Sequence, residues 1–472
     1  MSDYPYRYER TLRVADLRER FDELEPGAES GSEVRVAGRL LSIRKQGKAA
    51  FADLRDGMDR IQLFANQKVL GDDGMDSFVS LGVGDIVGAA GEVIKTRRGE
   101  LSVKVDEVIL LAECIRPMPE KWHGLSDIEV RYRQRYLDLL LNEEPRRALH
   151  ARARANSAIR AFFDGRGFSE VETPILHPIA GGAVARPFIT HHNALDIDLY
   201  LRIAPELYLK RLLIGGFDRI YELNRSFRNE GISPRHNPEY TMLEAYEAYV
   251  DFEDTMNLVE DLVKEIAQAV NGSLRFEVDG HELDFSAPFQ RRTMFEVIQQ
   301  ATGKDLLPVW TAGDAGSLGA IGDELGAAID PKWGPGKILL EIFEATTEKA
   351  LIDPIFVAGF PKEVSPLAKD HRSIPGFTEH ADLIIGGVEI APCYSELNDP
   401  EEQRRRFEQQ AAARAAGDDE ASLVDEDFLE ALSFGMPPAG GFGLGIDRLL
   451  MLLLGLPSLR EVILFPTLKP GQ

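Results

Sequence analysis

Short runs of alternating apolar and polar residues occupy the first part of the chain, from about Glu33 to Ala112. An alternation with period two indicates half-buried β-strands, and the Gly, Asp and Lys/Arg clusters between the runs indicate turns. Short strands in close succession are typical of a small barrel. We therefore predict an all-β barrel with strands at residues 34–40, 49–54, 60–65, 85–94 and 101–111.

From about Asp127 onward the pattern is mixed. Helical segments and strand-like runs follow one another without a regular strand–helix alternation, which predicts an α+β domain with a mostly antiparallel sheet. The longest strongly apolar run, Leu449 to Leu456, is far shorter than the ~20 residues that cross a bilayer, so we expect a core helix there. The helical segments lie at 146–166, 254–270 and 400–416, and the strand-like runs at 199–204, 219–224, 240–246 and 382–390.

These changes of pattern divide the chain into four expected parts. The first residues are polar and helix-leaning, and the Gly/Ser/Glu stretch at 25–32 is predicted to be a linker. The expected parts are an N-terminal helical and linker extension (1–32), a barrel (33–113), a second linker (114–126) and a large domain (127–472).

Charge and cysteine content narrow the class of protein. The chain has 472 residues with 54 Lys and Arg against 78 Asp and Glu, a formal charge of −24. Such acidity argues against indiscriminate binding to nucleic acid or anionic membrane. Two cysteines, Cys114 and Cys393, are too few for a disulfide framework or a cysteine metal cluster. Because the first residues also lack the apolar run of a signal peptide, we expect a cytoplasmic protein without a membrane partner.

One segment of the predicted barrel runs against the overall charge. The segment from Arg39 to Lys68 contains seven basic and three acidic residues, a local charge of +4. Phe51 and Phe64 are interleaved with them. Aromatic rings and basic side chains on a small barrel suit unpaired nucleic-acid bases and their phosphates. Solvated charges and core phenylalanines are the simpler explanation, which composition alone favours.

Two segments of the large domain carry candidate chemistry. Residues 227–246 form two extended runs around a loop, and the spacing puts Arg228 with Glu230 on one strand face, and Glu244 with Tyr246 on another. An arginine facing inward can clamp a phosphate or a carboxylate. Residues 440–448 carry a glycine run that ends at Arg448. Its spacing is neither a dinucleotide fingerprint nor a P-loop, and by itself it is also compatible with a tight helix-packing turn.

Together these segments resemble the three signature motifs of the class II aminoacyl-tRNA synthetases. The first corresponds to residues 167–174, the second to 227–246 and the third to 440–448. The resemblance covers nearly the whole chain from about Val34, and it is closest to the bacterial lysyl-tRNA synthetases of subclass b. The stretches that carry this closer resemblance are 131–139, 185–194, 201–210, 363–368 and 394–399.

The resemblance implies a fold and a reaction. The expected fold is an OB-fold anticodon-binding barrel followed by an α+β catalytic domain with an antiparallel sheet, in a homodimer built on the first motif. The expected reaction joins L-lysine to ATP with the help of Mg²⁺, giving lysyl-adenylate and pyrophosphate. The lysyl group then passes to the 3′ end of tRNA(Lys).

The resemblance also assigns residues to ATP and to magnesium. Arg228 would bridge the substrate carboxylate and the α-phosphate, and Arg448 would cover the adenine and the γ-phosphate; with Glu230 they form the expected catalytic set. Asp382 and Glu389 lie at the magnesium positions, where the first is usually Glu. The expected ATP-binding residues are Arg228, Glu230, His236, Asn237, Tyr240 (commonly Phe), Glu389 and Arg448.

The expected lysine pocket is acidic, because the substrate side chain ends in a cation. Glu206 and the backbone at Gly182 would hold the α-amino group, and Glu396 replaces the arginine with which aspartyl and asparaginyl relatives bind a side-chain oxygen. The side chain of lysine would lie among Glu244, Tyr246, Tyr394 and Glu396. In the barrel, the resemblance overturns the simpler explanation, and the expected anticodon-binding residues are Arg44, Phe51, Gln62 and Glu100.

One departure from the family pattern leaves alternatives open. Pro392 stands where the family has Asn, and Cys393 where it has a small residue. Proline has neither a polar side chain nor an N–H, so the pocket is either rebuilt with the same specificity or changed. A first alternative is a paralogue that activates a lysine-like amino acid for a non-translational acceptor. A second is a catalytically silent nucleic-acid-binding protein, which the complete set of motif arginines and acids makes improbable.

Overall fold

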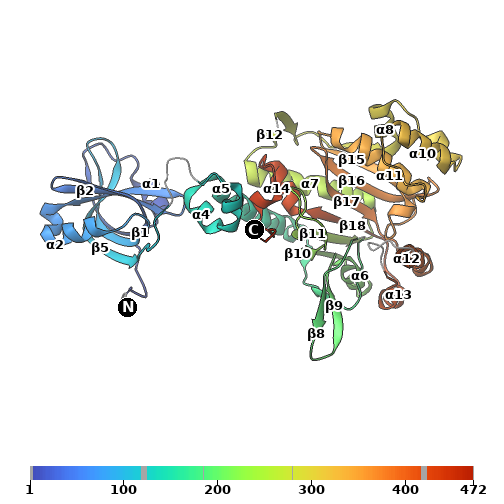
Figure 1. The fold of residues 1–472 in the computed structure, drawn as a ribbon, viewed down its shortest axis with the longest axis horizontal. Coiled ribbons are helices and arrows are strands. Elements are labelled where there is room, and N and C mark those ends of the chain that lie inside the picture. Colours follow the sequence, from blue (N-terminus) through green and yellow to red (C-terminus); the bar gives the residue numbers. More distant parts are fainter. Residues whose placement is uncertain (1–3, 119–124, 184, 279, 416–422, 471–472) are drawn as a thin grey trace. The chain divides into compact units, whose positions relative to one another are not determined.

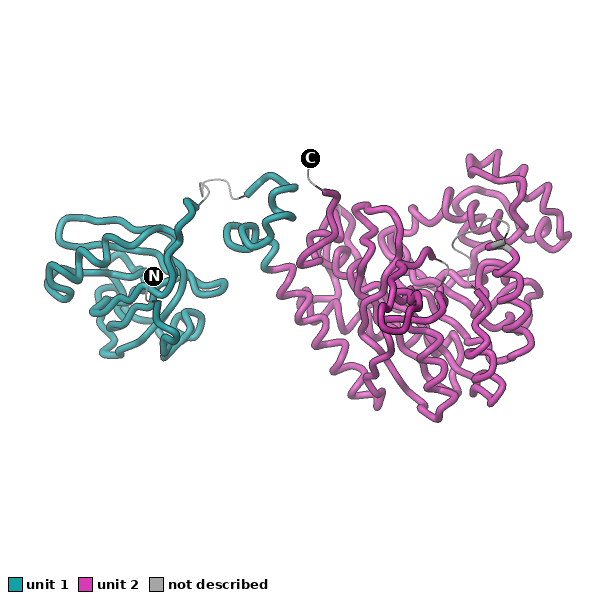
Figure 2. The backbone as a smooth tube through the Cα atoms, turned by 60° about the horizontal axis from the view of Figure 1, so that its bottom comes forward, with its two compact units in different colours: residues 1–146 teal, residues 147–472 magenta. Residues whose placement is uncertain are grey.

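The protein forms two compact units, residues 1–146 and 147–472, drawn in different colours in Figure 2. The computed structural model describes residues 4–118, 125–183, 185–278, 280–415 and 423–470. Part of the expected linker at 114–126 therefore lies outside the described residues, and the domain boundaries drawn from the sequence stay predictions. The helices that follow the barrel and precede residue 143 also belong to the first unit; they are α3 (Ile128–Arg133) and α4 (Arg135–Leu141).

The first unit is built around a closed five-stranded barrel, as the alternating pattern predicts (Figure 1). Inward-facing residues such as Val36, Ala52 and Leu63 are fully buried, because successive side chains point to opposite faces of a strand. The strands follow the order β1–β2–β3–β5–β4 around the barrel, and helix α2 (Gln67–Ser80), which the alternating pattern does not show, lies between β3 and β4 in the sequence. The strands are β1 (Glu29–Gln46), β2 (Ala49–Asp56), β3 (Asp59–Asn66), β4 (Ile86–Lys95) and β5 (Leu101–Ala112), and helix α1 (Val14–Phe21) precedes them.

The predicted linker at 25–32 is wrong in its second half, because β1 already begins at Glu29. Glu29 pairs with Ile94 of β4, and its carboxylate binds the Lys104 ammonium at 2.8 Å. Gly31 donates its N–H to Glu92 at 3.0 Å. The local preferences of small, flexible residues predict a linker. Pairing with partners on the neighbouring strand makes this stretch a β-strand instead.

The second unit contains an eight-stranded sheet with the order β14–β15–β16–β17–β18–β11–β10–β6. Its two outermost pairs are parallel and all pairs between them are antiparallel, which confirms the expected α+β architecture. The strands are β6 (Ser169–Glu170), β10 (Arg219–Phe227), β11 (Glu239–Ala248), β14 (Gln290–Thr293), β15 (Ile355–Pro361), β16 (Phe377–Ile385), β17 (Val388–Ser395) and β18 (Ala439–Gly445).

Two smaller sheets and a set of helices complete this unit. The apolar run near the C-terminus forms a core helix as expected, α14 (Ile446–Leu453). No helix among the described residues has both the length and the apolar character needed to cross a membrane. The remaining strands are β7 (Leu176–His177), β8 (Ile189–His192), β9 (Ile197–Leu201), β12 (Arg275–Val278) and β13 (His281–Asp284). The remaining helices are α5 (Glu144–Asp164), α6 (Glu206–Ile214), α7 (Phe252–Asn271), α8 (Met294–Thr302), α9 (Leu307–Thr311), α10 (Ala315–Glu324), α11 (Pro335–Thr346), α12 (Pro400–Ala415), α13 (Glu426–Leu432) and α15 (Leu459–Val462), with short 3₁₀ turns at η2 (Glu348–Ala350) and η3 (Lys362–Val364).

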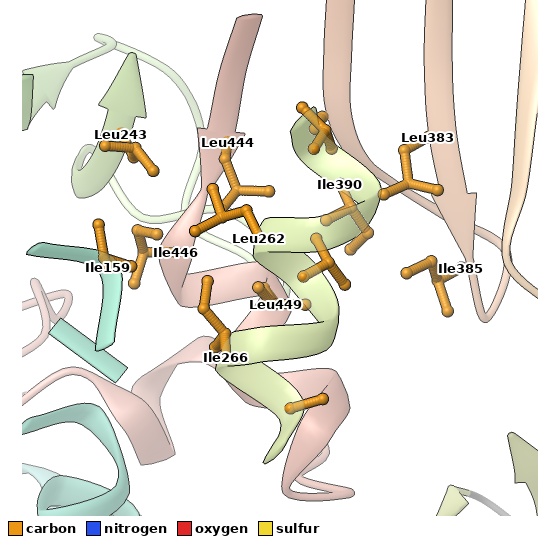
Figure 3. Close-up of a cluster of buried hydrophobic side chains, with 14 of the residues drawn as sticks. Ile159, Leu243, Leu262, Ile266, Leu383, Ile385, Ile390, Leu444, Ile446 and Leu449 are labelled. Atoms are coloured by element: carbon orange, nitrogen blue, oxygen red, sulfur yellow. The ribbon is translucent and has the colours of Figure 1, made fainter. Parts of the chain in front are cut away.

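The main core fills one face of the large sheet, against α5, α7 and α14 (Figure 3). Leu243 of β11 and Leu383 of β16 point into this core and are fully buried. Because side chains alternate along a strand, Glu244 and Tyr246 point to the opposite face, where Tyr246 packs with residues of α6. The core therefore fixes which side chains of β11 are available to a ligand.

Candidate active site

A cavity of about 510 Å³ lies over the face of the sheet opposite the main core. It lies over strands β11, β17 and β18 and is closed at its edges by the 227–240 loop, the start of α6 and the segment 364–368. Most of the residues expected to bind ATP and lysine line it. They are Gly182, Glu206, Arg228, Glu230, His236, Asn237, Tyr240, Glu244, Tyr246, Glu389, Tyr394 and Arg448. Asp382 and Glu396 are not among its lining residues.

Arg228 stands in the cavity with unused hydrogen-bonding capacity. Its backbone N–H donates to Pro238 O at 2.9 Å, which closes the base of the loop. Its Nε is buried and has no hydrogen-bond partner, and its guanidinium lies 5.4 Å from the centre of the Tyr240 ring. Burial lowers the pKa of Arg228, but nearby Tyr240, Glu389 and Glu230 more than offset it and raise the pKa. A guanidinium with a free donor edge is suited to an anionic ligand.

The acidic side of the cavity centres on Glu389. Burial and then the neighbouring Asp382 raise the pKa of Glu389, so the two carboxylates repel each other. Glu348 and Glu344 lie close enough for their pKa values to be raised as well, by burial first and then by acidic neighbours that include Glu389 and Asp382; the pKa of Glu344 is about 7. A cation is needed to hold such a cluster ionised.

The Asp382 carboxylate is hydrogen-bonded to a neighbouring side chain of the same strand, β16. Its Oδ1 lies 2.7 Å from His380 Nε2, and the His380 Nδ1 lies 2.8 Å from Ser365 Oγ. The imidazole is stacked on Phe360 and packs against Tyr394, with ring centres at 4.0 and 4.4 Å. The carboxylate at the expected magnesium position is therefore oriented by a buried chain of hydrogen bonds.

Arg448 and the 227–240 loop form the outer part of the cavity. The Arg448 Nη1 donates to Glu389 O at 3.2 Å and lies 3.8 Å from the Glu389 carboxylate. The His236 Nδ1 lies 2.9 Å from Ser233 Oγ, and partial burial of the ring, followed by the charge of Arg448, lowers its pKa. A neutral imidazole at this place is available to hydrogen-bond a phosphate oxygen.

Asn237 has a second use that sequence reasoning missed. Its Nδ2 donates to Glu239 O at 2.5 Å, and its Oδ1 accepts from Thr467 N at 3.2 Å. Both ends of the amide are therefore engaged with backbone, and the residue fastens the C-terminal segment to the loop. Its expected role in binding ATP stays a prediction.

Glu244 is the buried acid at the inner end of the cavity. It is 3 % exposed, and Tyr246 Oη donates to its Oε2 at 3.3 Å. Within the described residues its carboxylate takes part in no ion pair, and burial raises its pKa well above the usual range. On the neighbouring strand Glu222 has a cation of its own, because Arg202 Nη1 lies 2.7 Å from its Oε1. Glu244 alone of this pair is left for a ligand cation.

Glycines of β18 make room beside these acids. Gly441 pairs with both Tyr246 and Tyr394, and Gly443 pairs with Glu244. A Cβ on Gly441 would collide with the Tyr246 ring and the Glu396 carboxylate. Gly441 is therefore required by close packing of pocket side chains, whereas a Cβ on Gly443 would make only ordinary contacts.

Glu396 is held by a residue that sequence reasoning missed. Its Oε2 lies 2.6 Å from Lys210 Nζ, and the same ammonium binds Glu206 Oε1 at 2.7 Å. The sequence signal was available, because Lys210 interrupts an apolar helical stretch and follows Glu206 by four residues, the spacing of helix neighbours. The expected contact of Glu396 with lysine stays a prediction.

The departure at residues 392–393 is accommodated within β17, next to a register shift in the β16–β17 pairing between Leu383 and Ile384. Pro392 lines the cavity and pairs with Asp382 of β16, just before the residues of β17 that pair with β18. Its missing N–H therefore does not interrupt the β17–β18 ladder. Cys393 faces the core and is fully buried, and burial raises the pKa of its thiol well above normal. It fills space and is not a reactive thiolate.

The expected anticodon-binding residues of the barrel lie on neighbouring strands. Arg44 of β1 pairs with Phe51 of β2, which pairs in turn with Phe64 of β3; the two rings stack with centres 5.2 Å apart. Gln62 accepts from Ser102 Oγ at 3.0 Å. Glu100 is exposed just before β5. Arg44, Phe51 and Phe64 therefore form a row of one basic and two aromatic side chains across three strands.

Comparison with known proteins gives separate family matches for the barrel and for the large domain. Residues 127–469 match the family described as class II tRNA synthetases (D, K and N), and residues 34–111 match the OB-fold nucleic acid binding domain of the tRNA anticodon family. The chain is 54% identical to a lysine–tRNA ligase of Moorella thermoacetica over 98% of this chain and 94% of that protein. It is 50% identical to one of Syntrophomonas wolfei (98% and 92%) and 49% identical to one of Carboxydothermus hydrogenoformans (99% and 94%).

Proposed function

The chain belongs to the class II tRNA synthetases of the D, K and N group, as a member of the lysine–tRNA ligase family, and we propose that it charges tRNA(Lys) with L-lysine at the expense of ATP. The lysine carboxylate attacks the α-phosphorus of ATP, and pyrophosphate leaves. The terminal ribose hydroxyl of tRNA then attacks the lysyl carbonyl, and AMP leaves.

The observation that carries this proposal is the polarity of the cavity. Arg228 offers a free donor edge to anions, and Glu244 is a buried acid without a cation of its own among the described residues. Both line the same cavity. An amino acid with a carboxylate at one end and an ammonium at the other satisfies both groups. Bringing a carboxylate to a phosphate requires charge neutralisation, which Arg228 and Arg448 supply.

We also propose that Mg²⁺ accompanies ATP at Asp382 and Glu389. Their mutual repulsion, extended to Glu344 and Glu348, supports a divalent cation there. No group of three or more acidic, His or Cys side chains among the described residues is arranged to hold a metal by itself. This fits Mg²⁺, which is commonly held by one or two carboxylates together with substrate phosphates. The ion would neutralise the phosphate charge.

The direct test is lysine-dependent exchange of labelled pyrophosphate into ATP, measured with each of the common amino acids. We expect exchange with lysine alone at low substrate concentration, and charging of tRNA with a UUU anticodon. Pro392→Asn should leave kcat/KM for lysine within about threefold of the parent value, because the pocket is closed without that amide. The absence of lysine-dependent exchange would refute the proposal. Exchange with a lysine analogue together with no tRNA charging would favour the paralogue, which none of the comparisons supports.

The barrel is proposed to read the anticodon through Phe51, Gln62, Glu100 and Arg44. Stacking on an aromatic ring contributes about 1–3 kcal/mol per base, so Phe51→Ala should raise KM for tRNA roughly 5- to 100-fold. Exchange without tRNA should be unchanged. Tyr6→Ala, at a fully exposed ring of the same unit, serves as the control and should leave both values unchanged. Equal KM values for the two variants would contradict this role.

We further propose a cytoplasmic homodimer. Exposed apolar side chains gather on the small β7–β9–β8 sheet that follows the first motif, among them Leu176, Ile189 and Ile197. Exposed apolar side chains gathered in one place are typical of surfaces that associate. Both cysteines are free, which suits a reducing compartment.

A further inference from the structure

Lys210 is a buried cation next to the proposed lysine pocket. Its side chain is 0 % exposed, on α6, one turn after Glu206. Its Nζ lies 2.7 Å from Glu206 Oε1, 2.6 Å from Glu396 Oε2 and 3.4 Å from Leu367 O. An ammonium has three N–H donors, so these three acceptors use all of them. Lys210 is therefore fixed in one position by groups from three different segments of the chain.

Of the two acids that Lys210 joins, Glu206 lines the cavity, and Glu396 lies beside Tyr246, which also lines it. Glu206 lines the cavity beside Gly182, whose missing Cβ would lie 3.7 Å from Glu206 Cβ. Glu396 is directed toward Gly441, with its second oxygen next to the Tyr246 ring. Without the ammonium the buried Glu396 carboxylate and the partly buried Glu206 carboxylate would lie near each other with no partner of opposite charge, which is strongly unfavourable.

The charges of the pocket match those of one kind of substrate. When all three are ionised, Glu206, Glu244 and Glu396 carry three negative charges, and the Lys210 ammonium offsets one of them. A net charge of about −2 then remains on these acids, and Arg228, which lines the same cavity, is free for a carboxylate. L-Lysine brings two ammonium groups and one carboxylate. A neutral side chain would leave one pocket acid uncompensated.

On the premise of the proposed function, we propose that Lys210 is a positioning residue that determines specificity. Its resident ammonium aims Glu206 and Glu396 and holds the pocket at the charge that only an amino acid with a second ammonium group balances. Lys210 does not line the cavity, so it acts through the two carboxylates.

The test compares L-lysine with L-norleucine, which has the same carbon skeleton without the ε-amino group. Pyrophosphate exchange is measured for the parent protein and for Lys210→Gln, which keeps a donor but removes the charge. We expect kcat/KM for lysine to fall about tenfold or more and the lysine-to-norleucine ratio to fall with it. KM for ATP should change by less than about twofold, because the ATP end of the cavity is untouched.

Three further variants separate this role from a structural one. Lys210→Met repeats the test with an apolar side chain of similar length, should the Gln variant not fold. Lys210→Arg keeps the charge and should restore most of the lysine-to-norleucine ratio. Leu209→Met changes an equally buried neighbour on α6 and should leave the ratio unchanged. Circular dichroism melts check that each variant is folded.

The outcomes are distinct. A ratio that is unchanged in the neutral variants, or that falls equally in the Arg variant, overturns the role of Lys210 while the parent protein still exchanges with lysine. A parent protein that shows no lysine-dependent exchange overturns the proposed function instead.

Discussion

Replacing Arg228 by alanine should lower kcat/KM for lysine-dependent pyrophosphate exchange by on the order of 10³-fold. The side chain has a buried Nε without a partner and lines the cavity. In the reaction two anions must meet, and a fixed guanidinium between them stabilises charge as it shifts from the carboxylate to the phosphate. The loss should therefore fall mainly on kcat, with a smaller change in KM for each substrate.

Two controls make the Arg228 result specific. Arg228→Lys keeps the charge but not the planar pair of donors, so its activity should lie between the parent and the alanine variant. Arg225→Ala removes an exposed arginine of β10, the strand that ends just before Arg228, and this arginine lies outside the cavity; exchange should stay near the parent level. Similar losses for Arg228→Ala and Arg225→Ala would show that the effect comes from the strand and not from the site.

Glu244→Gln should weaken lysine binding strongly while leaving ATP binding intact. The Glu244 carboxylate is 3 % exposed and has no ion pair among the described residues. Losing one partner of a buried charge pair costs about 2–5 kcal/mol, which corresponds to a loss of roughly 30-fold to several thousand-fold in kcat/KM for lysine. KM for ATP, measured at saturating lysine, is the internal control. Glu247→Gln, on the opposite face of β11 and paired with Arg219, is the matched variant.

The same pocket predicts a pH dependence. Burial raises the pKa of Glu396 to about 7 and raises that of Glu244 well above normal. Below its pKa a carboxylate is protonated and no longer attracts an ammonium, so kcat/KM for lysine should fall as the pH falls through about 7. Glu244→Gln should flatten part of that fall. A profile that is level across neutral pH would contradict the assignment of these acids to the lysine side chain.

Much of the site follows from local sequence. Period-two alternation places Glu244 and Tyr246 on the face away from the core, and the structure has them there. The five alternating runs become the five strands of the barrel, and the mixed pattern becomes the antiparallel sheet. Alternation is a property of neighbouring residues along one strand, so it needs no knowledge of distant partners.

Other features of the structure are not predicted from the sequence, because they depend on contacts that local residue preferences do not show. The Gly/Ser/Glu stretch before residue 33 has the composition of a linker, yet β4 and Lys104 hold Glu29 as strand. The contact of Asn237 with Thr467, which fastens the C-terminal segment, is also not visible in the sequence. In both cases a decisive partner lies far away in the sequence.

The sequence by itself determined the family, the faces of the strands and the identity of most cavity residues, because motif spacing and strand periodicity are local. Only the tertiary structure decided how the buried charges are paired: Glu222 has Arg202, Glu396 has Lys210, and Glu244 has no cation of its own among the described residues. The partners come from different elements, and a buried charge is stable only where folding brings an opposite charge to it. Which acid remains open to a substrate is therefore set by the fold.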